Sequence, residues 1–67
     1  MRAITQSNGF VVEEKKIYKT RFGELVKILN INHETNQVKV YNISESAHIW
    51  HRIDGVIKDN KFKDFSK

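Results

Sequence analysis

Two apolar runs separated by a polar turn occupy the middle of the chain, from Leu25 to Ser44. On each side of the turn a lysine stands between β-branched residues, in Val26-Lys27-Ile28 and in Val38-Lys39-Val40. Val and Ile favour the pleated surface of a strand, and alternation with a period of two buries one face and leaves the other in solvent. The intervening segment 32–37 has no large apolar residue and contains asparagine, which favours turns. We predict a β-hairpin with Lys27 and Lys39 on its polar face.

The parity of these strands is mixed. Leu29 and Ile31 fall on the opposite parity from Val26, and Tyr41 falls on the opposite parity from Val40. Either the strands are apolar on both faces, or a bulge switches the buried face part-way along. We expect a bend or bulge near Leu29–Ile31 and another near Tyr41.

The size of the chain limits it to one domain, because it has only 67 residues. A core of this size gives a net stability of roughly 3–5 kcal/mol. The sequence contains no cysteine, so no disulfide or cysteine-based zinc cluster can add to that stability. We expect a monomer or a small homo-oligomer that is stabilised by packing.

The charge and hydropathy of the chain limit the cellular locations and the classes of partner that it can have. No apolar run approaches the ~20 residues of a membrane span, and residues 1–9 lack the apolar stretch of a signal peptide. Together with the absence of cysteine, this favours a cytoplasmic location. A net charge of +4 fits a nucleic acid or an anionic protein surface as partner, and it argues against a DNA-mimicking inhibitor, which would be acidic.

The N-terminal half of the chain predicts an arm followed by the start of the domain. Residues 1–8 are mostly polar and are expected to form a flexible arm, with a single small domain over residues 9–67. The alternation in Ile17–Arg21 predicts a strand with Tyr18 facing inward. Phe22-Gly23-Glu24 then forms a tight turn into the hairpin.

The C-terminal half leaves one element open. Ile49–Ile53 predicts a strand centred on Trp50, and Asp54-Gly55 is a suitable two-residue hairpin turn. The spacing of Trp50, Ile53 and Ile57 also fits a helix, but Gly55 would weaken that helix at its middle. We therefore favour strand–turn–strand over this segment. Phe62 and Phe65 are three residues apart, which predicts a single helical turn that places both rings under the barrel.

The segment Ile17–Phe65 resembles an SH3-like barrel of the KOW and Tudor type. The shared features are a leading strand, the glycine turn at Phe22-Gly23, two long hairpin strands, a strand with Trp50 and a short closing element. Arg21–Val26 is loosely similar to the glycine-centred KOW motif. The resemblance implies an all-β, five-stranded, partly open barrel. The ALYDY-like stretch and paired tryptophan of peptide-binding SH3 domains are absent, and the resemblance transfers no functional residue, because fold alone does not determine function.

The histidines that flank Trp50, His48 and His51, are the residues nearest to a metal or catalytic pattern. A metal site would need a third ligand such as His33 or Asp54. No nucleophile elbow, phosphate loop or pair of catalytic carboxylates accompanies them. We expect no enzymatic activity, no metal and no cofactor.

Basic and aromatic residues provide the candidate binding surface. The residues expected to bind a nucleic acid or a protein partner are Lys19, Arg21, Lys27, Lys39, Tyr41, Trp50, His51 and Arg52. Small barrels bind single strands by stacking bases on exposed aromatic rings within a positive groove. The residue types therefore favour a non-enzymatic, nucleic-acid-binding module.

The alternative function is a protein-interaction module, such as a small adaptor or a bacteriophage-encoded inhibitor of a host protein. The open edge strand of a barrel can accept a partner strand. In a chain this short a tryptophan usually belongs to the core, and lysines usually cover a solvated face. Two structural questions therefore decide the value of the candidate surface: whether Trp50 is exposed, and whether the lysines share one face.

Overall fold

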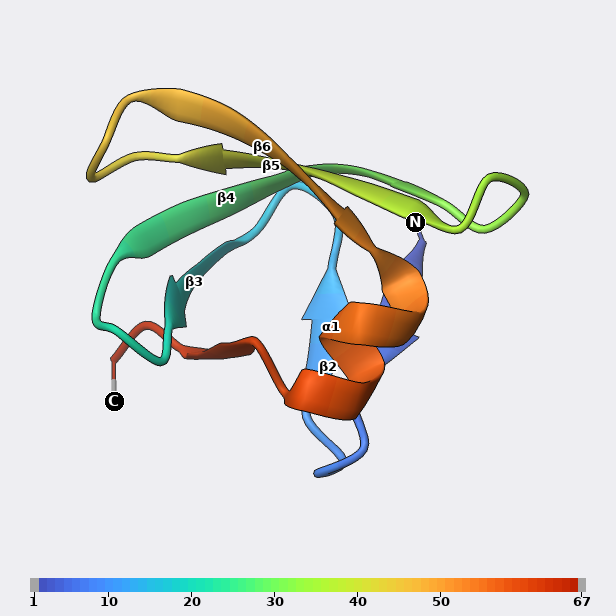
Figure 1. Cartoon of the computed structure of the whole chain (residues 1–67). Helices are drawn as coiled ribbons and strands as arrows, with labels where there is room; N and C mark the ends of the chain where they lie inside the picture. The colour runs from blue at the N-terminus through green and yellow to red at the C-terminus, as the bar shows by residue number, and fades with distance from the viewer. Residues whose placement is uncertain (1, 67) are drawn as a thin grey trace.

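The computed structural model describes residues 2–66, which form seven strands and one helix (Figure 1). The elements in chain order are β1 (Ala3–Thr5), β2 (Val11–Glu13), β3 (Ile17–Thr20), β4 (Leu25–Asn32), β5 (Gln37–Asn42), β6 (Ala47–Arg52), α1 (Ile53–Asp59) and β7 (Phe62–Asp64). Five strands form one antiparallel sheet in the order β6-β5-β4-β3-β7, and β1 pairs with β2 in a small second sheet. The larger sheet is curled, and α1 with the β1–β2 pair lies below its concave side. The sequence predicted an all-β, five-stranded, partly open barrel, and the structure confirms its coarser part, a mostly β chain with a curled five-stranded antiparallel half-barrel sheet.

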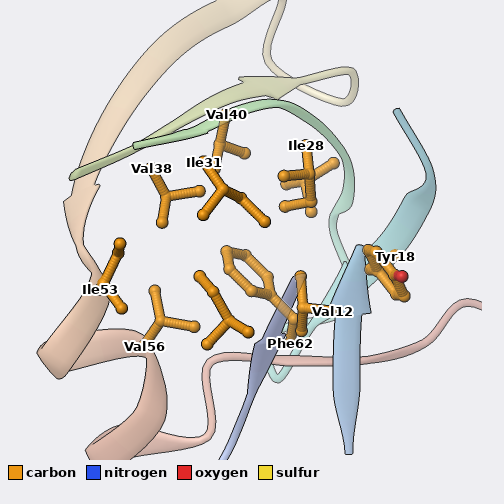
Figure 2. Packing of buried hydrophobic residues seen from close by; sticks show 11 residues of the cluster. Val12, Tyr18, Ile28, Ile31, Val38, Val40, Ile53, Val56 and Phe62 are labelled. Carbon is orange, nitrogen blue, oxygen red and sulfur yellow. The ribbon is translucent and has the colours of Figure 1, made fainter. Parts of the chain in front are cut away.

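The core lies between the concave face of the large sheet and the elements below it (Figure 2). Val26, Ile28 and Ile31 from β4 and Val38 and Val40 from β5 are almost completely buried. The elements below the sheet add Ile4, Val12, Ile53 and Val56, and the edge strand β7 adds Phe62. Phe62 is the largest fully buried side chain, and its ring projects into the middle of the cluster. The alternation that predicted the hairpin thus corresponds to real burial, and Tyr18 of β3 faces inward as predicted.

The predicted change of parity in the first hairpin strand is a β-bulge. Ile28 pairs with Val40, and the register then shifts so that Asn30 pairs with Lys39. The extra residue returns Ile31 to the buried face. The prediction of a second irregularity near Tyr41 is wrong, because β5 pairs with β6 in continuous register through that residue.

Residues 2–8 are part of the fold, contrary to the flexible arm expected over residues 1–8, of which Met1 lies outside the described residues. Ala3–Thr5 forms β1, and Ile4 is buried in the core. Gln6 is also buried: its Oε1 accepts the backbone N–H of Phe62 at 3.0 Å, and its Nε2 donates to the Phe62 carbonyl at 2.9 Å. A polar segment can be ordered in this way when one amide side chain satisfies both backbone groups of a buried residue.

The segment after Trp50 is a helix and not the second strand of a hairpin. The strand β6 exists as predicted, but Ile53–Asp59 forms α1, with Asn60 as a left-handed C-cap. Ile53 and Val56 are buried on one side of α1, and Ile57 packs against the core. This packing outweighs the weak helix propensity of Gly55.

Two further expectations for this end of the chain differ from the structure. The helical turn predicted over Phe62–Phe65 is wrong, because Phe62–Asp64 pairs with β3 as β7. Phe62 is buried, whereas Phe65 is largely exposed. Within residues 2–66, no helix has the length and apolar content needed to cross a membrane.

The substitution Gly55→Ala tests the helical assignment. A methyl group added at Gly55 meets no atom within 4 Å, and the residue has no positive φ. Alanine is favoured over glycine in a helix interior, so the free energy of unfolding should increase by about 0.5–1 kcal/mol. Urea denaturation measures this change. A loss of stability would contradict the helix and would indicate the hairpin turn, in which a residue at this position needs positive φ.

Candidate functional site

The outer face of the large sheet gathers most of the predicted binding residues. Lys27 of β4 pairs with Tyr41 of β5, and Tyr41 pairs with His48 of β6. In the neighbouring row, Lys39 pairs with Trp50. Lys27, Lys39 and Tyr41 alternate with buried residues, and the exposed His48 and Trp50 alternate with half-buried ones, so these side chains lie on the convex side, away from the core.

The aromatic residues of this face are held beside cationic or ring partners. Trp50 is 56% exposed, and the Nζ atom of Lys39 lies 5.7 Å from the centroid of its ring. The rings of Tyr41 and His48 are 5.0 Å apart and tilted by 54°. An aromatic ring with a cation at this distance is stabilised in place, and it keeps its remaining surface open. Trp50 is therefore not a core residue, and it is available for stacking.

Within four of the five strands of this sheet, the charge has one sign. The four strands from β3 to β6 comprise 24 residues and contain no Asp or Glu. The acidic residues between them lie in the turns, at Glu24, Glu34 and Glu45. Lys19 also faces outward, because its neighbour Tyr18 is buried and its partner Leu25 is on the outer side. We call the surface formed by Lys19, Lys27, Lys39, Tyr41, His48 and Trp50 the outer face.

Arg52 and Arg21 lie at the borders of the outer face. Arg52 ends β6, and its guanidinium donates two hydrogen bonds to Asp54, at 3.2 and 3.3 Å. The hydrogen bond from Arg52 lowers the pKa of the Asp54 carboxyl, which keeps this pair ionised. Arg21 belongs to the turn between β3 and β4, where its guanidinium carbon lies 5.5 Å from the centroid of Phe22.

His51 points to the opposite side of the sheet from Trp50. Its ring packs against Phe62 with centroids 5.9 Å apart and an interplanar angle of 73°. Burial, and secondarily the charge of Lys61, lowers the pKa of His51. The structure therefore separates His51 from the other predicted binding residues.

A cavity of about 160 Å³ lies on this inner side, between β6 and the turn that joins β3 to β4. Ile49 and His51 line it from β6, Phe62 lines it from β7, and Phe22 lines it from the turn. Phe22 is 80% exposed, which makes it the most exposed of the large apolar residues in the described part of the chain. The sequence pattern places Phe22 in a turn and predicts no role for it. An aromatic residue placed directly before a turn glycine is the signal that could have drawn attention to it.

The His and acidic residues do not gather into a metal site. Among residues 2–66, no three side chains of His, Cys, Asp or Glu come close enough to hold an ion. A scan against protein-family models and searches of curated proteins and of solved structures found no match for the chain. The chemistry of the surface itself therefore indicates the function.

The environment of His51 can be tested by NMR titration. We expect a pKa below the ordinary value of 6.5, because the imidazolium is disfavoured by burial and by Lys61. Lys61→Gln should raise this pKa part of the way back. Because the pKa of His51 is lower in the folded state, the unfolded chain takes up the proton more readily. The free energy of unfolding should therefore decrease as the pH falls through and below 6.5. A pKa of His51 at or above 6.5 would show that the ring does not occupy the inner side of the sheet.

Proposed function

We propose that the chain is a non-enzymatic module that binds single-stranded nucleic acid through its outer face. The observation that carries this proposal is an exposed tryptophan on a sheet in which the four adjacent strands β3 to β6 contain no acidic residue. Phosphates favour such a surface, because each neutralised phosphate releases counterions.

The arrangement of the outer face favours a single strand over a duplex. Trp50 and Tyr41 are on neighbouring strands and present ring faces on which unpaired bases can stack. On the same side of the sheet, Lys39 lies directly opposite Trp50, and Lys27 lies opposite Tyr41 on the strand away from Trp50. Both lysines flank the rings and can contact the backbone phosphates. A base in a duplex is already stacked on its neighbours, so the rings would contribute little there.

The SH3-like architecture belongs to the same proposal. A curled, five-stranded antiparallel sheet with a short helix before its last strand is consistent with a partly open SH3-like barrel. In this proposal the barrel serves as a rigid support that keeps the lysines and aromatic rings on one surface. The absence of cysteine from the sequence fits a reducing compartment such as the cytoplasm.

Nucleic-acid binding can be measured by the quenching of Trp50 fluorescence, since this is the one tryptophan of the chain. A mixed-sequence, single-stranded oligonucleotide should bind with an affinity that falls steeply with salt. Lys27→Glu and Lys39→Glu should each weaken binding and reduce the slope of log K against log[salt] by about 0.7 or more, because each removes a phosphate contact.

Two further variants separate the outer face from net charge. Trp50→Ala, followed by fluorescence anisotropy of a labelled oligonucleotide, should weaken binding by about tenfold, as expected for the loss of one stacked base. Lys58→Glu makes the same change in net charge on an exposed position of α1 and should have a much smaller effect. Equal losses for Lys58→Glu and Lys39→Glu, or an affinity independent of salt, would refute the proposal.

A further inference from the structure

The outer edge of β6 is uncovered, and its backbone groups can be assigned from the hydrogen bonds of β4. The Ile28 N–H donates to the Lys16 carbonyl, and the Ile28 carbonyl accepts the Lys15 N–H. The Ile31 N–H donates to the Glu14 carboxylate, and the Ile31 carbonyl accepts a hydrogen bond from the Arg2 guanidinium. Both residues therefore direct their backbone groups away from β5. In an antiparallel ladder, residues alternate between the two neighbours, so the β5 partners of Ile28 and Ile31 must bond to β6.

This alternation leaves the N–H and C=O groups of His48 and Trp50 pointing away from the sheet. Val40 and Val38 of β5 pair with Ile49 and His51 of β6. The backbone N–H and C=O groups of Ile49 and His51 are therefore hydrogen-bonded to β5. Within residues 2–66, no strand lies beyond β6 in the sheet.

The edge lacks the features that usually prevent strand addition. Natural edge strands are blocked by proline, bulges, inward-pointing charges or very short length. β6 has six residues in unbroken register with β5, and it contains no proline and no bulge. Its one permanently charged residue, Arg52, is at its end and is paired with Asp54.

The inner cavity lies directly beneath this edge. Ile49 and His51 form its wall on β6, and the exposed ring of Phe22 stands at its mouth. Its volume of about 160 Å³ is close to that of apolar cavities that hold benzene, at roughly 150 Å³. The space therefore suits one aromatic or large branched side chain.

We propose that the β6 edge binds an extended segment of a partner protein by strand addition, with one large apolar side chain of that segment in the cavity. A strand that pairs with His48 and Trp50 alternates its side chains across the sheet. The residue opposite Ile49 faces the cavity, and its two neighbours lie on the other side of the sheet, opposite His48 and Trp50.

The charges around the cavity indicate an acidic segment. Arg21 and Lys61 line the cavity at its border. The acidic residue of the lining, Glu24, accepts a hydrogen bond from the buried Asn42 at 3.4 Å. Lys61 is also 3.7 Å from the exposed carboxylate of Asp59. Asp or Glu residues two positions before and after the apolar anchor share its side of the sheet and would meet the two cations. A second copy of this chain fits less well, because β6-to-β6 pairing would bring together two chains that each carry +4.

A capped peptide of sequence Asp-Thr-Phe-Thr-Asp provides the probe for an NMR titration of the whole chain. Saturable binding should protect the amide protons of His48 and Trp50 from exchange and should give contacts between the peptide ring and Phe62. Replacement of the peptide Phe by Ala should weaken binding by about tenfold, as for other buried aromatic anchors.

Phe22→Ala supplies a variant that keeps the fold, because this side chain is 80% exposed. It should weaken peptide binding several-fold and leave oligonucleotide binding at the outer face unchanged. Three outcomes would overturn the inference: no saturable binding of the peptide, equal affinity for the Phe and Ala peptides, or protection of the two amides by dimer formation without peptide. Loss of oligonucleotide binding alone would count against the proposed function and not against this one.

Discussion

The β-bulge in β4 is the constraint on which the rest of the structure depends. Without the extra residue between Ile28 and Asn30, strict alternation would expose Ile31 and turn Asn30 toward the core. The bulge keeps three apolar residues of a long strand on one face while the strand bends. Beyond it, the Glu14 carboxylate accepts the Ile31 N–H at 2.7 Å, and this hydrogen bond lowers the pKa of Glu14. The connection between β2 and β3, which contains Glu14, therefore completes the hydrogen bonding at this edge of the hairpin.

The curl that results divides the sheet into two chemically different sides. The concave side holds the core and the cavity beside Phe62, and the convex side holds Lys27, Lys39 and Trp50. A chain of 67 residues cannot cover both sides of a five-stranded sheet with its single short helix and β1–β2 pair. The uncovered side carries lysines together with Trp50 and the partly exposed Ile17, and the uncovered edge of β6 lies where the two sides meet. Both proposals make use of surfaces that the short chain leaves open.

Much of the fold was predictable from local patterns, and the misses have physical causes. Alternation identified the hairpin, its outward lysines and the bulge near Leu29, because a period of two reports directly on burial. The α1 helix was missed because Asp54-Gly55 is a strong turn signal and packing of Val56 outweighed it. Only part of the candidate surface was predictable. The alternation of residues along the strands predicted that Lys27 and Lys39 face outward. The exposure of Trp50 and the inward direction of His51 depend on the position of β6 in the sheet.

The central claim is that single-stranded nucleic acid binds the convex side of the sheet. Amide chemical-shift mapping with an unlabelled single-stranded oligonucleotide tests it most directly, because it locates the contact residue by residue. We predict that the largest shifts will fall on Lys27, Lys39, Tyr41 and Trp50, with little change in α1 or in the β1–β2 pair. Shifts centred on His51 and Phe62, or spread evenly over the lysines of the whole chain, would contradict the account.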